Sequence, residues 1–286
     1  MKIAIFGNSM KAAIKEDLAH LIEFLQLRGI DIVLSQEIRS EMNLRQFQPF
    51  IHEDGQKEPN VDFVLSIGGD GTFLTTASAV GDSDIPILGI NCGHLGFLTN
   101  VQTRDADYIL DLLIQGKYTL EERSLLHVTC SEGGYLASPY ALNEVAIQHN
   151  GPSSMLFIEV FLDGEYLHTY NADGLIIATA TGSTAYNLSI GGPIMMPDVK
   201  GLVLTPLASH SLTVRPLVIA DDKTIDIRTA SRAGTTYMVS VDGRGHTMRE
   251  DITLHIEKAP YTVKMVQIDN NSFIRSLKNK MHWGEK

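Results

Sequence analysis

At 286 residues, the chain is long enough to bury a substantial core, and its length favours two domains over one or three. Hydrophobic residues make up 44% of it and charged residues 20%, which is typical of a folded globular protein and excludes a disordered or collagen-like chain. The formal net charge of −11 argues against a nucleic-acid partner, because such binding needs a surplus of Lys and Arg.

The sequence shows no signal peptide, no membrane span and no cysteine pattern of a disulfide scaffold. The first apolar run stops at Gly7, too early for a signal-peptide core or a membrane span, and no other stretch is long enough to cross a membrane. The two cysteines, Cys92 and Cys130, form no CxxC pair, so neither a zinc site nor a disulfide scaffold is indicated. We therefore expect a cytoplasmic protein with no membrane partner.

The N-terminal residues predict a parallel βαβ unit. A short apolar run over residues 3–6 ends in the turn-like Gly7-Asn8-Ser9, and apolar residues then recur at helical spacing from Ala13 to Leu25. Gly29 is a suitable helix end, and residues 30–34 form a second β-rich run.

The same alternation continues to about residue 117. Residues 35–60 are polar and predict a connection with at most a short helix. A buried strand over 61–67 leads into Gly68-Gly69-Asp70-Gly71-Thr72, a helix is expected over 73–80, and a strand over 85–90 follows. We predict a Rossmann-like open α/β sheet over residues 1–117, with its ligand beyond the carboxyl ends of the strands.

The pattern changes after residue 118 to short alternating runs, which predict a mainly antiparallel β-sandwich over residues 118–264. Asp163-Gly164 and Asp242-Gly243 each separate two such runs and predict tight hairpin turns. The runs lie over residues 125–130, 141–148, 156–162 and 224–228.

The Gly68–Thr72 segment carries the first chemical signal. Glycines between a strand and a helix allow backbone N–H groups to approach phosphate oxygens. A carboxylate among phosphates is costly unless it binds a metal ion or takes a proton, which makes Asp70 a candidate general base. The alternative is a plain strand-to-helix turn that Asp70 caps. The segment has neither the Gly-Lys-Ser/Thr ending of a P-loop nor a GxGxxG pattern, which disfavours both of those classes.

This GGDGT segment resembles one found in NAD kinases, in diacylglycerol and sphingosine kinases and, as a close variant, in phosphofructokinases. All of these transfer phosphoryl groups to hydroxyls. The run from Asp173 to Ser189, DGLIIATATGSTAYNLS, closely resembles the NAD-kinase signature DGLIVSTPTGSTAY, although Ala180 stands where the family often has proline. A surface hairpin rich in Thr and Ser is the alternative explanation for this run.

Further segments match the NAD-kinase family in order, from roughly residue 62 to 245. Asn143-Glu144 matches the family's Asn-Glu pair, and simple surface polarity is the alternative. The segment from Asn91 to Leu98 resembles NxGxLGFL, in which Phe97 either packs on the nicotinamide ring or belongs to the core, and His94 is either structural or catalytic. Residues 210–217 and the SxDG-like turn at residues 240–244 also match.

The resemblance implies a mechanism and a set of site residues. NAD is expected between the domains, and ATP with Mg²⁺ over the Gly68–Thr72 segment. Asp70 accepts the 2′-hydroxyl proton of the adenosine ribose as the oxygen attacks the γ-phosphorus, which yields NADP. Asp173 contacts the nicotinamide-ribose side, and no protein side chain is assigned to the metal. The triphosphate contacts are Gly68, Gly69, Gly71 and Thr72, and the NAD contacts are Asp70, Gly71, Phe97, Asn143, Glu144, Asp173, Thr181, Thr184, Ala185, Tyr186 and Ser189.

The resemblance also supports a C-terminal strand over 261–268 and a helix over 273–283, with residues from about 265 to 286 packing on the first domain. It implies a homo-oligomer, a tetramer or a dimer. Two other hypotheses remain at this stage: a lipid or sugar kinase that shares GGDGT, and a non-catalytic NAD(P) sensor. The sequence leaves open whether polyphosphate replaces ATP and whether NADH is accepted.

Overall fold

The computed structural model describes residues 1–7, 12–93, 96–99, 101–151, 155–231, 236–268 and 273–281. The chain divides into two units, the first made of Met1–Glu122 and Val263–Lys286 and the second of Arg123–Thr262. Strands β7 (Thr119–Cys130) and β18 (Leu254–Gln267) have residues in both units. Among the described residues, no helix is long and apolar enough to cross a membrane.

The first unit is built on a parallel sheet with the strand order β3-β2-β1-β4-β5. The short β6 and the end of β18 also pair with β5 in parallel. The chain moves outward from β1 to β3 and then returns to the other side of β1 at β4, as in doubly wound α/β folds. The elements are β1 (Lys2–Gly7), α1 (Ala12–Leu27), β2 (Asp31–Leu34), α2 (Gln36–Glu41), β3 (Gln48–Pro49), β4 (Phe63–Ile67), α3 (Asp70–Val80), β5 (Ile87–Asn91), β6 (Val101–Gln102), a 3-10 turn (Thr103–Asp105), α4 (Ala106–Ile114) and α6 (Phe273–Met281).

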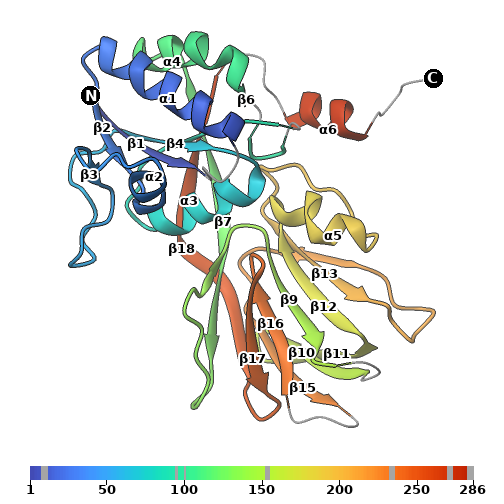
Figure 1. Ribbon diagram of the computed structural model, residues 1–286. Coiled ribbons are helices and arrows are strands. Elements are labelled where there is room, and N and C mark those ends of the chain that lie inside the picture. The colour runs from blue at the N-terminus through green and yellow to red at the C-terminus, as the bar shows by residue number, and fades with distance from the viewer. Residues whose placement is uncertain are drawn as a thin grey trace. The chain divides into compact units, whose positions relative to one another are not determined.

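Helices cover both faces of this sheet. Figure 1 shows α1 and α4 on one side of the strands and α3 on the other. The alternation along β4 explains the division: Leu65 packs into the core that contains α1 and α4, whereas Ser66 faces α3. There the Thr76 hydroxyl donates to Ser66 Oγ at 3.0 Å. The predicted Rossmann-like open sheet is therefore confirmed.

The end of α1, which Gly29 predicts, and the start of α2 agree with the local chemistry. Gly29, two residues after α1 ends at Leu27, adopts a positive φ of 67°, and the N–H of Ile30 donates to the Leu25 carbonyl at 3.2 Å. Ser35 caps α2 by accepting from the N–H of Ile38 at 3.4 Å. Residues 35–60 contain only this six-residue helix and the two-residue β3, as the polar composition predicts.

The second unit contains two antiparallel sheets. The first sheet has the order β14-β13-β12-β9-β16-β17, and in the second β11-β10-β15 continue to β18. Their inner faces share one core, to which Val145 and Ile177 contribute from one sheet and Ile158 and Ile227 from the other. The predicted β-sandwich is confirmed. The elements besides β7 and β18 are β8 (Tyr140–Ala141), β9 (Glu144–His149), β10 (Leu156–Leu162), β11 (Glu165–Ala172), β12 (Gly174–Thr179), a 3-10 turn (Gly182–Thr184), α5 (Tyr186–Ser189), β13 (Gly201–Leu207), β14 (Leu217–Ala220), β15 (Ile225–Ser231), β16 (Thr236–Val241) and β17 (Arg244–Arg249).

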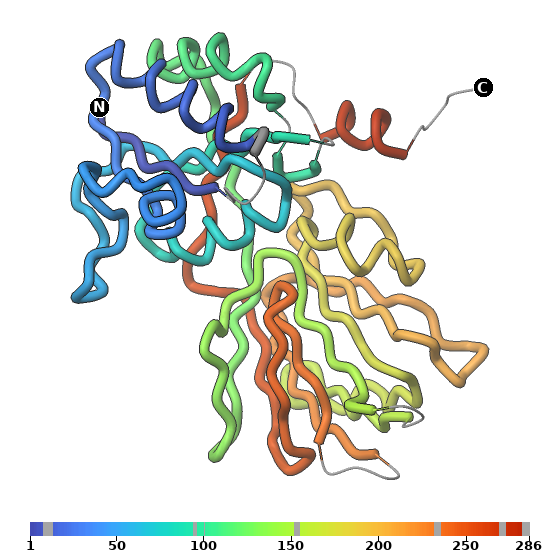
Figure 2. Tube along the Cα trace, in the orientation of Figure 1, coloured from blue at the N-terminus to red at the C-terminus, as the bar shows by residue number. Residues whose placement is uncertain are grey.

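Both Asp-Gly pairs form two-residue hairpin turns. Asp163-Gly164 joins β10 to β11 with φ values of 50° and 80°, and Asp242-Gly243 joins β16 to β17 with values of 47° and 77°. Positive φ at both positions is the signature of a type I′ turn, which Asp and Gly tolerate. Figure 2 shows β16 and β17 running side by side from this turn.

Three predictions were partly wrong or fall outside the described residues. The run that follows β12 is not a surface hairpin, because it forms a 3-10 turn and the short α5. The strand predicted over 261–268 is the end of β18, which begins at Leu254. Helix α6 is described to Met281, so Trp283 lies outside the described residues, as do Asn8 and Ser9.

Candidate active site

The Gly68–Thr72 segment joins β4 to the N-terminus of α3. Gly68 has a φ of 153°, and a Cβ atom there would lie 2.4 Å from Thr72 Oγ1. An added Cβ at Gly69 or Gly71 would meet no atom of the described residues within 4 Å. The N–H groups in the first turn of a helix have no helical acceptor, and phosphate oxygens suit them.

Asp70 does not cap this helix. Helix α3 begins at Asp70 itself, its cap residue is Gly69, and no side chain caps it, so the capping role that the alternative gives to Asp70 is wrong. The Asp70 carboxylate instead reaches a segment almost thirty residues later in the chain. Its Oδ2 accepts from the N–H of Phe97 at 2.8 Å, and its Oδ1 accepts from the N–H of Leu98 at 3.0 Å and from the N–H and hydroxyl of Thr99 at 3.1 and 3.0 Å.

Gly96 permits this close approach, since an added Cβ would lie 1.8 Å from Asp70 Oδ1. Phe97 is partly exposed, so it is not a core residue. Its ring instead contacts Phe273 and Lys280 of α6. His94 and Leu95 of the same motif lie outside the described residues.

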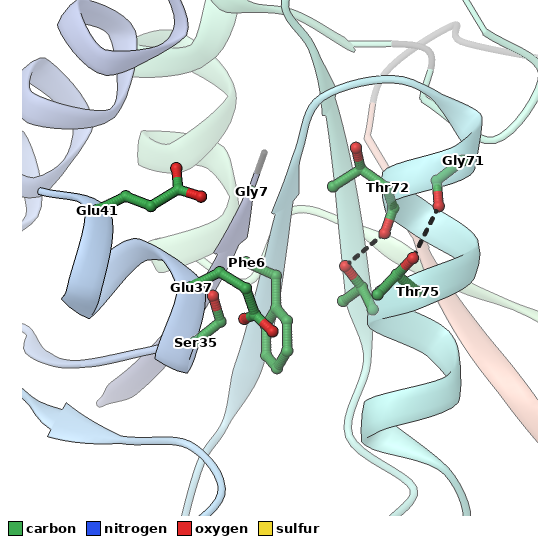
Figure 3. Close-up of a pocket in the computed structure, with 9 residues that line it drawn as sticks. Phe6, Gly7, Ser35, Glu37, Glu41, Gly71, Thr72 and Thr75 are labelled. Carbon is green, nitrogen blue, oxygen red and sulfur yellow. Dashed lines mark hydrogen bonds between the residues drawn. The ribbon is translucent and has the colours of Figure 1, made fainter. Parts of the chain in front are cut away.

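A cavity of about 320 Å³ opens beside the Gly68–Thr72 segment. The carboxyl end of β1 forms its floor, where the direction of strand succession reverses and ligands bind in open α/β sheets. Figure 3 shows Thr72 and Thr75 of α3 on one wall and Glu37 and Glu41 of α2 on the opposite wall. The cavity is lined by Phe6, Gly7, Ser35, Glu37, Glu41, Gly71, Thr72, Thr75 and Thr76.

In the second unit, Asn143 and Glu144 are buried at 7% and 9% exposure, so surface polarity does not explain them. Asp242 in the β16–β17 turn fixes their backbone. Its Oδ1 accepts from the N–H groups of Asn143 and Glu144 at 2.8 and 3.1 Å, and its Oδ2 accepts from the N–H of Leu142 at 2.7 Å. Burial nevertheless raises the pKa of Asp242 above its ordinary value, an effect that these N–H groups and Arg244 oppose.

Glu144 has an unusual electrostatic environment. Burial, together with the nearby Asp242 carboxylate, raises its pKa to about 7, although a hydrogen bond from the Tyr186 N–H opposes the rise. Its Oε2 is buried and has no hydrogen-bond partner among the described residues. A buried oxygen of this kind is costly unless a ligand supplies a donor, which fits a ligand-binding carboxyl group.

The run after β12 packs directly on the Asn143–Glu144 pair. A Cβ at Gly182 would lie 2.0 Å from the Asn143 carbonyl oxygen, so glycine allows the contact. The fully buried Asn187 secures the run, because its amide donates to the carbonyls of Ser183 and Pro193, both at 3.1 Å. Its Oδ1 accepts from the Thr205 hydroxyl at 2.6 Å.

The remaining predicted NAD contacts in the second unit follow β12, except for Asp173, which precedes it. Tyr186 Oη accepts from Gln148 at 2.8 Å, the Ser189 hydroxyl donates to the Tyr186 carbonyl at 2.8 Å, and the Thr184 hydroxyl donates to the Thr181 carbonyl at 3.2 Å. These residues and Ala185 follow β12, whereas Asp173 precedes it, so about 20 Å of strand separates Asp173 from the group. Asp173 instead lies beside the ends of β9 and β13, where its backbone pairs with His149 and Leu207.

Several residues of these sites carry no signal in the sequence. Thr99 acts on a carboxylate almost thirty positions away, and Glu37 and Glu41 lie in a polar connection without a motif. Arg123 is 3% exposed and donates to Thr181 Oγ1 at 3.3 Å. The SxDG-like turn matches the family pattern, but only the folded backbone shows that Asp242 accepts from the Asn143 N–H.

Both units of the chain match protein-family profiles. Residues 3–118 match the profile of the ATP-NAD kinase N-terminal domain, and residues 142–268 match that of the ATP-NAD kinase C-terminal domain. The chain belongs to the ATP-NAD kinase family. This membership sets aside the lipid-kinase and sugar-kinase alternatives.

Relatives named NAD kinase match over nearly the whole chain. The protein of Bacteroides fragilis is 43% identical over 99% of this chain and 98% of its own, and that of Flavobacterium johnsoniae is 40% identical over 100% and 99%. The crystal structure of an NAD kinase from Archaeoglobus fulgidus in complex with ATP matches with a TM-score of 0.75 at 25% identity, covering 96% of this chain and 99% of that one. Yeast NADH kinase complexed with NADH has the same fold, with a TM-score of 0.85 at 23% identity over 100% of this chain and 89% of that one.

Proposed function

We propose that the chain transfers the γ-phosphoryl group of ATP to the 2′-hydroxyl of the adenosine ribose of NAD, making NADP. The Asp70 carboxylate carries the proposal, because it lies at the start of a helix whose glycine-flanked N-terminus suits phosphate. The family membership of both halves of the chain supports it.

The hydrogen bonds of Asp70 favour one of its two carboxylate oxygens as the proton acceptor. A carboxylate has about four acceptor positions on its two oxygens. Oδ1 accepts three hydrogen bonds, whereas Oδ2 accepts one from the described residues, that of the Phe97 N–H. In the proposed step, Oδ2 takes the proton of the 2′-hydroxyl, the oxygen forms a bond to the γ-phosphorus, and the bond from phosphorus to the β–γ bridging oxygen breaks to release ADP.

We propose that the two units divide the substrates. The α/β domain, residues 1–117 with the tail from about 265, holds the triphosphate on Gly68, Gly69, Gly71 and Thr72. The β-rich domain, residues 118–264, holds the adenine and its ribose. The buried Asn143 and Glu144 and the run that packs on them support this assignment. Asp173 stays assigned to the nicotinamide-ribose side as a prediction.

The walls of the cavity beside Thr72 fit a magnesium ion. Glu37 and Glu41 would repel a bare triphosphate, and carboxylate oxygens are ligands that Mg²⁺ prefers. The described residues contain no cluster of three or more metal-binding side chains, so the ion is expected to be held largely by the phosphates. When bound, it would neutralise charge on the triphosphate. The cytoplasmic location and the homo-oligomer stay predictions.

The decisive experiment measures NADP formation from NAD with ATP, other triphosphates and polyphosphate as donors, and repeats it with NADH. Asp70→Asn is expected to lower kcat by about 10²- to 10⁴-fold, and calorimetry with NAD separates loss of the base from loss of the NAD contact that the resemblance gives to Asp70. Asp82→Asn, at an exposed residue just beyond the end of α3, is the matched control and should keep full activity. Near wild-type rates for Asp70→Asn would show that Asp70 is not the base. Tight NAD binding by the wild-type protein with no turnover for any donor would favour a non-catalytic sensor.

A further inference from the structure

Strand β14 is an open edge of the first sheet in the second unit. It ends the strand order β14-β13-β12-β9-β16-β17, and in the part of the chain that the structure describes it pairs with β13 alone. The N–H of Asp221 donates to the Lys200 carbonyl at 3.4 Å, and hydrogen-bonded pairs alternate along an antiparallel ladder. The backbone of Ile219 therefore bonds to β13, whereas the N–H and C=O groups of Val218 and Ala220 point outward.

The surface beside this edge is apolar. Fourteen large hydrophobic side chains of the described residues are exposed, and five of them lie between residues 196 and 218. Val218 is 49% exposed on the same face of the sheet as Ala220, next to the open backbone groups. Exposed apolar side chains along an unpaired edge favour association with another strand. The five side chains are Met196, Val199, Leu212, Leu217 and Val218.

The charges at the two ends of β14 are of opposite sign. Arg215 precedes the strand and Asp221 and Asp222 follow it, and both Arg215 and Asp222 are exposed. Two copies of the strand that pair antiparallel bring Arg215 of each copy to the acidic end of the other, whereas parallel copies oppose like charges. Because cross-strand pairs of opposite charge stabilise a sheet and like charges destabilise it, the edge is complementary to itself. A second copy of this chain is therefore the partner that the charges fit.

We propose that β14 pairs with β14 of a second copy across a two-fold axis at Val218, which joins the two six-stranded sheets. Hydrogen bonds then run from the Val218 N–H of each copy to the Val218 carbonyl of the other. Ala220 lies opposite Pro216, whose carbonyl accepts from the Ala220 N–H, so a proline without an N–H is tolerated at this edge. Two-fold dimers are the commonest homo-oligomers, and this one is independent of the proposed phosphoryl transfer.

Charge also decides the register of the two strands. An axis one residue later in the strand would set Arg215 opposite Lys223 of the other copy, and an axis one residue earlier would set it opposite the apolar Ile219. The axis at Val218 sets it opposite Asp221, so this register is the one that pairs unlike charges.

The first test measures the mass of the full chain by sedimentation at micromolar concentration, with circular dichroism to show that each variant is folded. The wild-type protein should be a dimer or a larger even oligomer, and Val218→Lys should halve that mass because two ammonium groups meet at the axis. Thr247→Lys, at an exposed residue of β17 on the opposite edge of the same sheet, is the matched control and should keep the wild-type mass. A monomeric wild-type protein, or an unchanged mass for folded Val218→Lys, overturns the inference.

The second test uses a cross-link and adds no charge, so it decides the question even where Val218→Lys does not fold. Opposite Cα atoms of a hydrogen-bonded antiparallel pair lie about 5.5 Å apart, which a disulfide spans. Val218→Cys should therefore form a linked dimer on oxidation, and Thr247→Cys should not. A linked dimer in neither variant, or in both to the same extent, overturns the inference.

The third test exchanges the charges at the ends of the strand. Arg215→Glu should weaken the dimer about fivefold or more, because both symmetry-related pairs become repulsive. Lys258 Nζ lies 2.7 Å from Asp221 Oδ2, so the exposed Asp222 is exchanged in its place. Adding Asp222→Arg should restore the association, which a loss of folding would not allow. An Arg215→Glu protein that associates as tightly as the wild type, or a double variant that does not recover, overturns the inference.

Discussion

Thr99 donates both its backbone N–H and its hydroxyl to one oxygen of Asp70, at 3.1 and 3.0 Å. The N–H groups of Phe97 and Leu98 also donate to Asp70, so this carboxylate is the anchor that holds the backbone of residues 97–99. The carboxylate is thereby oriented before any substrate binds. Such preorganisation is what a base that acts at one atom requires.

Gly96→Ala should disable this anchor. The added Cβ would lie 1.8 Å from Asp70 Oδ1, so the segment has to move away from the carboxylate. Overpacking of this kind costs about 1 to 3 kcal/mol of stability, and we expect kcat to fall by about tenfold or more because a small displacement of a catalytic group is costly. Thermal unfolding and NADP formation measure the two effects. Gly93→Ala is the control, because among the described residues its Cβ would meet Asn91 Oδ1 alone, at an ordinary 3.9 Å. Equal behaviour of the two variants would contradict the anchor.

The raised pKa of Glu144 should make stability depend on pH. Since its pKa is about 7 in the folded protein against 4.5 as the reference, its contribution to stability is complete below about pH 4.5. That contribution is lost as the pH rises through about 7, and its size is about 3 kcal/mol. The raised pKa of Asp242 acts in the same direction.

Urea unfolding of the wild-type protein and of Glu144→Gln at several pH values between 4.5 and 8 measures this contribution. The variant should gain stability relative to the wild-type protein as the pH rises. Glu159→Gln, at an exposed position of β10, is the control for the same substitution outside the buried pair. A constant difference for Glu144→Gln would show that its carboxyl group titrates normally.

Thr205→Val should loosen the run after β12. It keeps the shape of the side chain but removes the hydroxyl that donates to the buried Asn187 Oδ1, which costs about 1 to 3 kcal/mol because the amide oxygen loses its donor. The KM for NAD should rise with it. Thr169→Val removes a hydroxyl that hydrogen-bonds to the exposed Tyr166 hydroxyl, and it should cost much less. Chemical denaturation of the two variants side by side checks the difference, and equal losses would refute it.

Tyr186→Ala should weaken NAD binding in calorimetry by about tenfold or more, because a large aromatic surface beside the Asn143–Glu144 pair is removed. Tyr186→Phe separates the ring from the hydroxyl, which accepts from Gln148, and we expect a smaller loss. Tyr166→Ala, at an exposed tyrosine of the same unit, is the control. Unchanged affinity in Tyr186→Ala would count against this part of the NAD pocket.

The fold was largely predictable because local rules and tertiary structure agree in it. Gly29 ends α1 in the conformation that glycine favours, and both Asp-Gly pairs form the turns that their φ preferences predict. For β18, the sequence predicts only the second half of the strand, over residues 261–268. This fourteen-residue strand has residues in both units. It pairs with β5 near its end, at Met265.

The sites were predictable only where a motif marks them. GGDGT and the run from Asp173 to Ser189 indicate which residues belong to a site. The sequence does not show what the side chains of these residues contact. The partners of Asp70 lie almost thirty residues away, and Asp242 reaches Asn143 across about one hundred residues. Such contacts are set by the strand order, which a motif does not contain. Asp173 shows the same limit, since neighbours in one motif lie at opposite ends of a strand.

The passage of β7 and β18 between the units has a consequence for biosynthesis. The second unit is one uninterrupted stretch, Arg123–Thr262, whereas the first is completed only by residues that follow it. During synthesis, Ile87 of β5 therefore lacks its parallel partner Met265 until the whole sandwich has been translated. An unpaired strand edge is prone to association with other chains. Slow translation of the sandwich should thus lengthen the period in which the nascent α/β sheet needs chaperone protection.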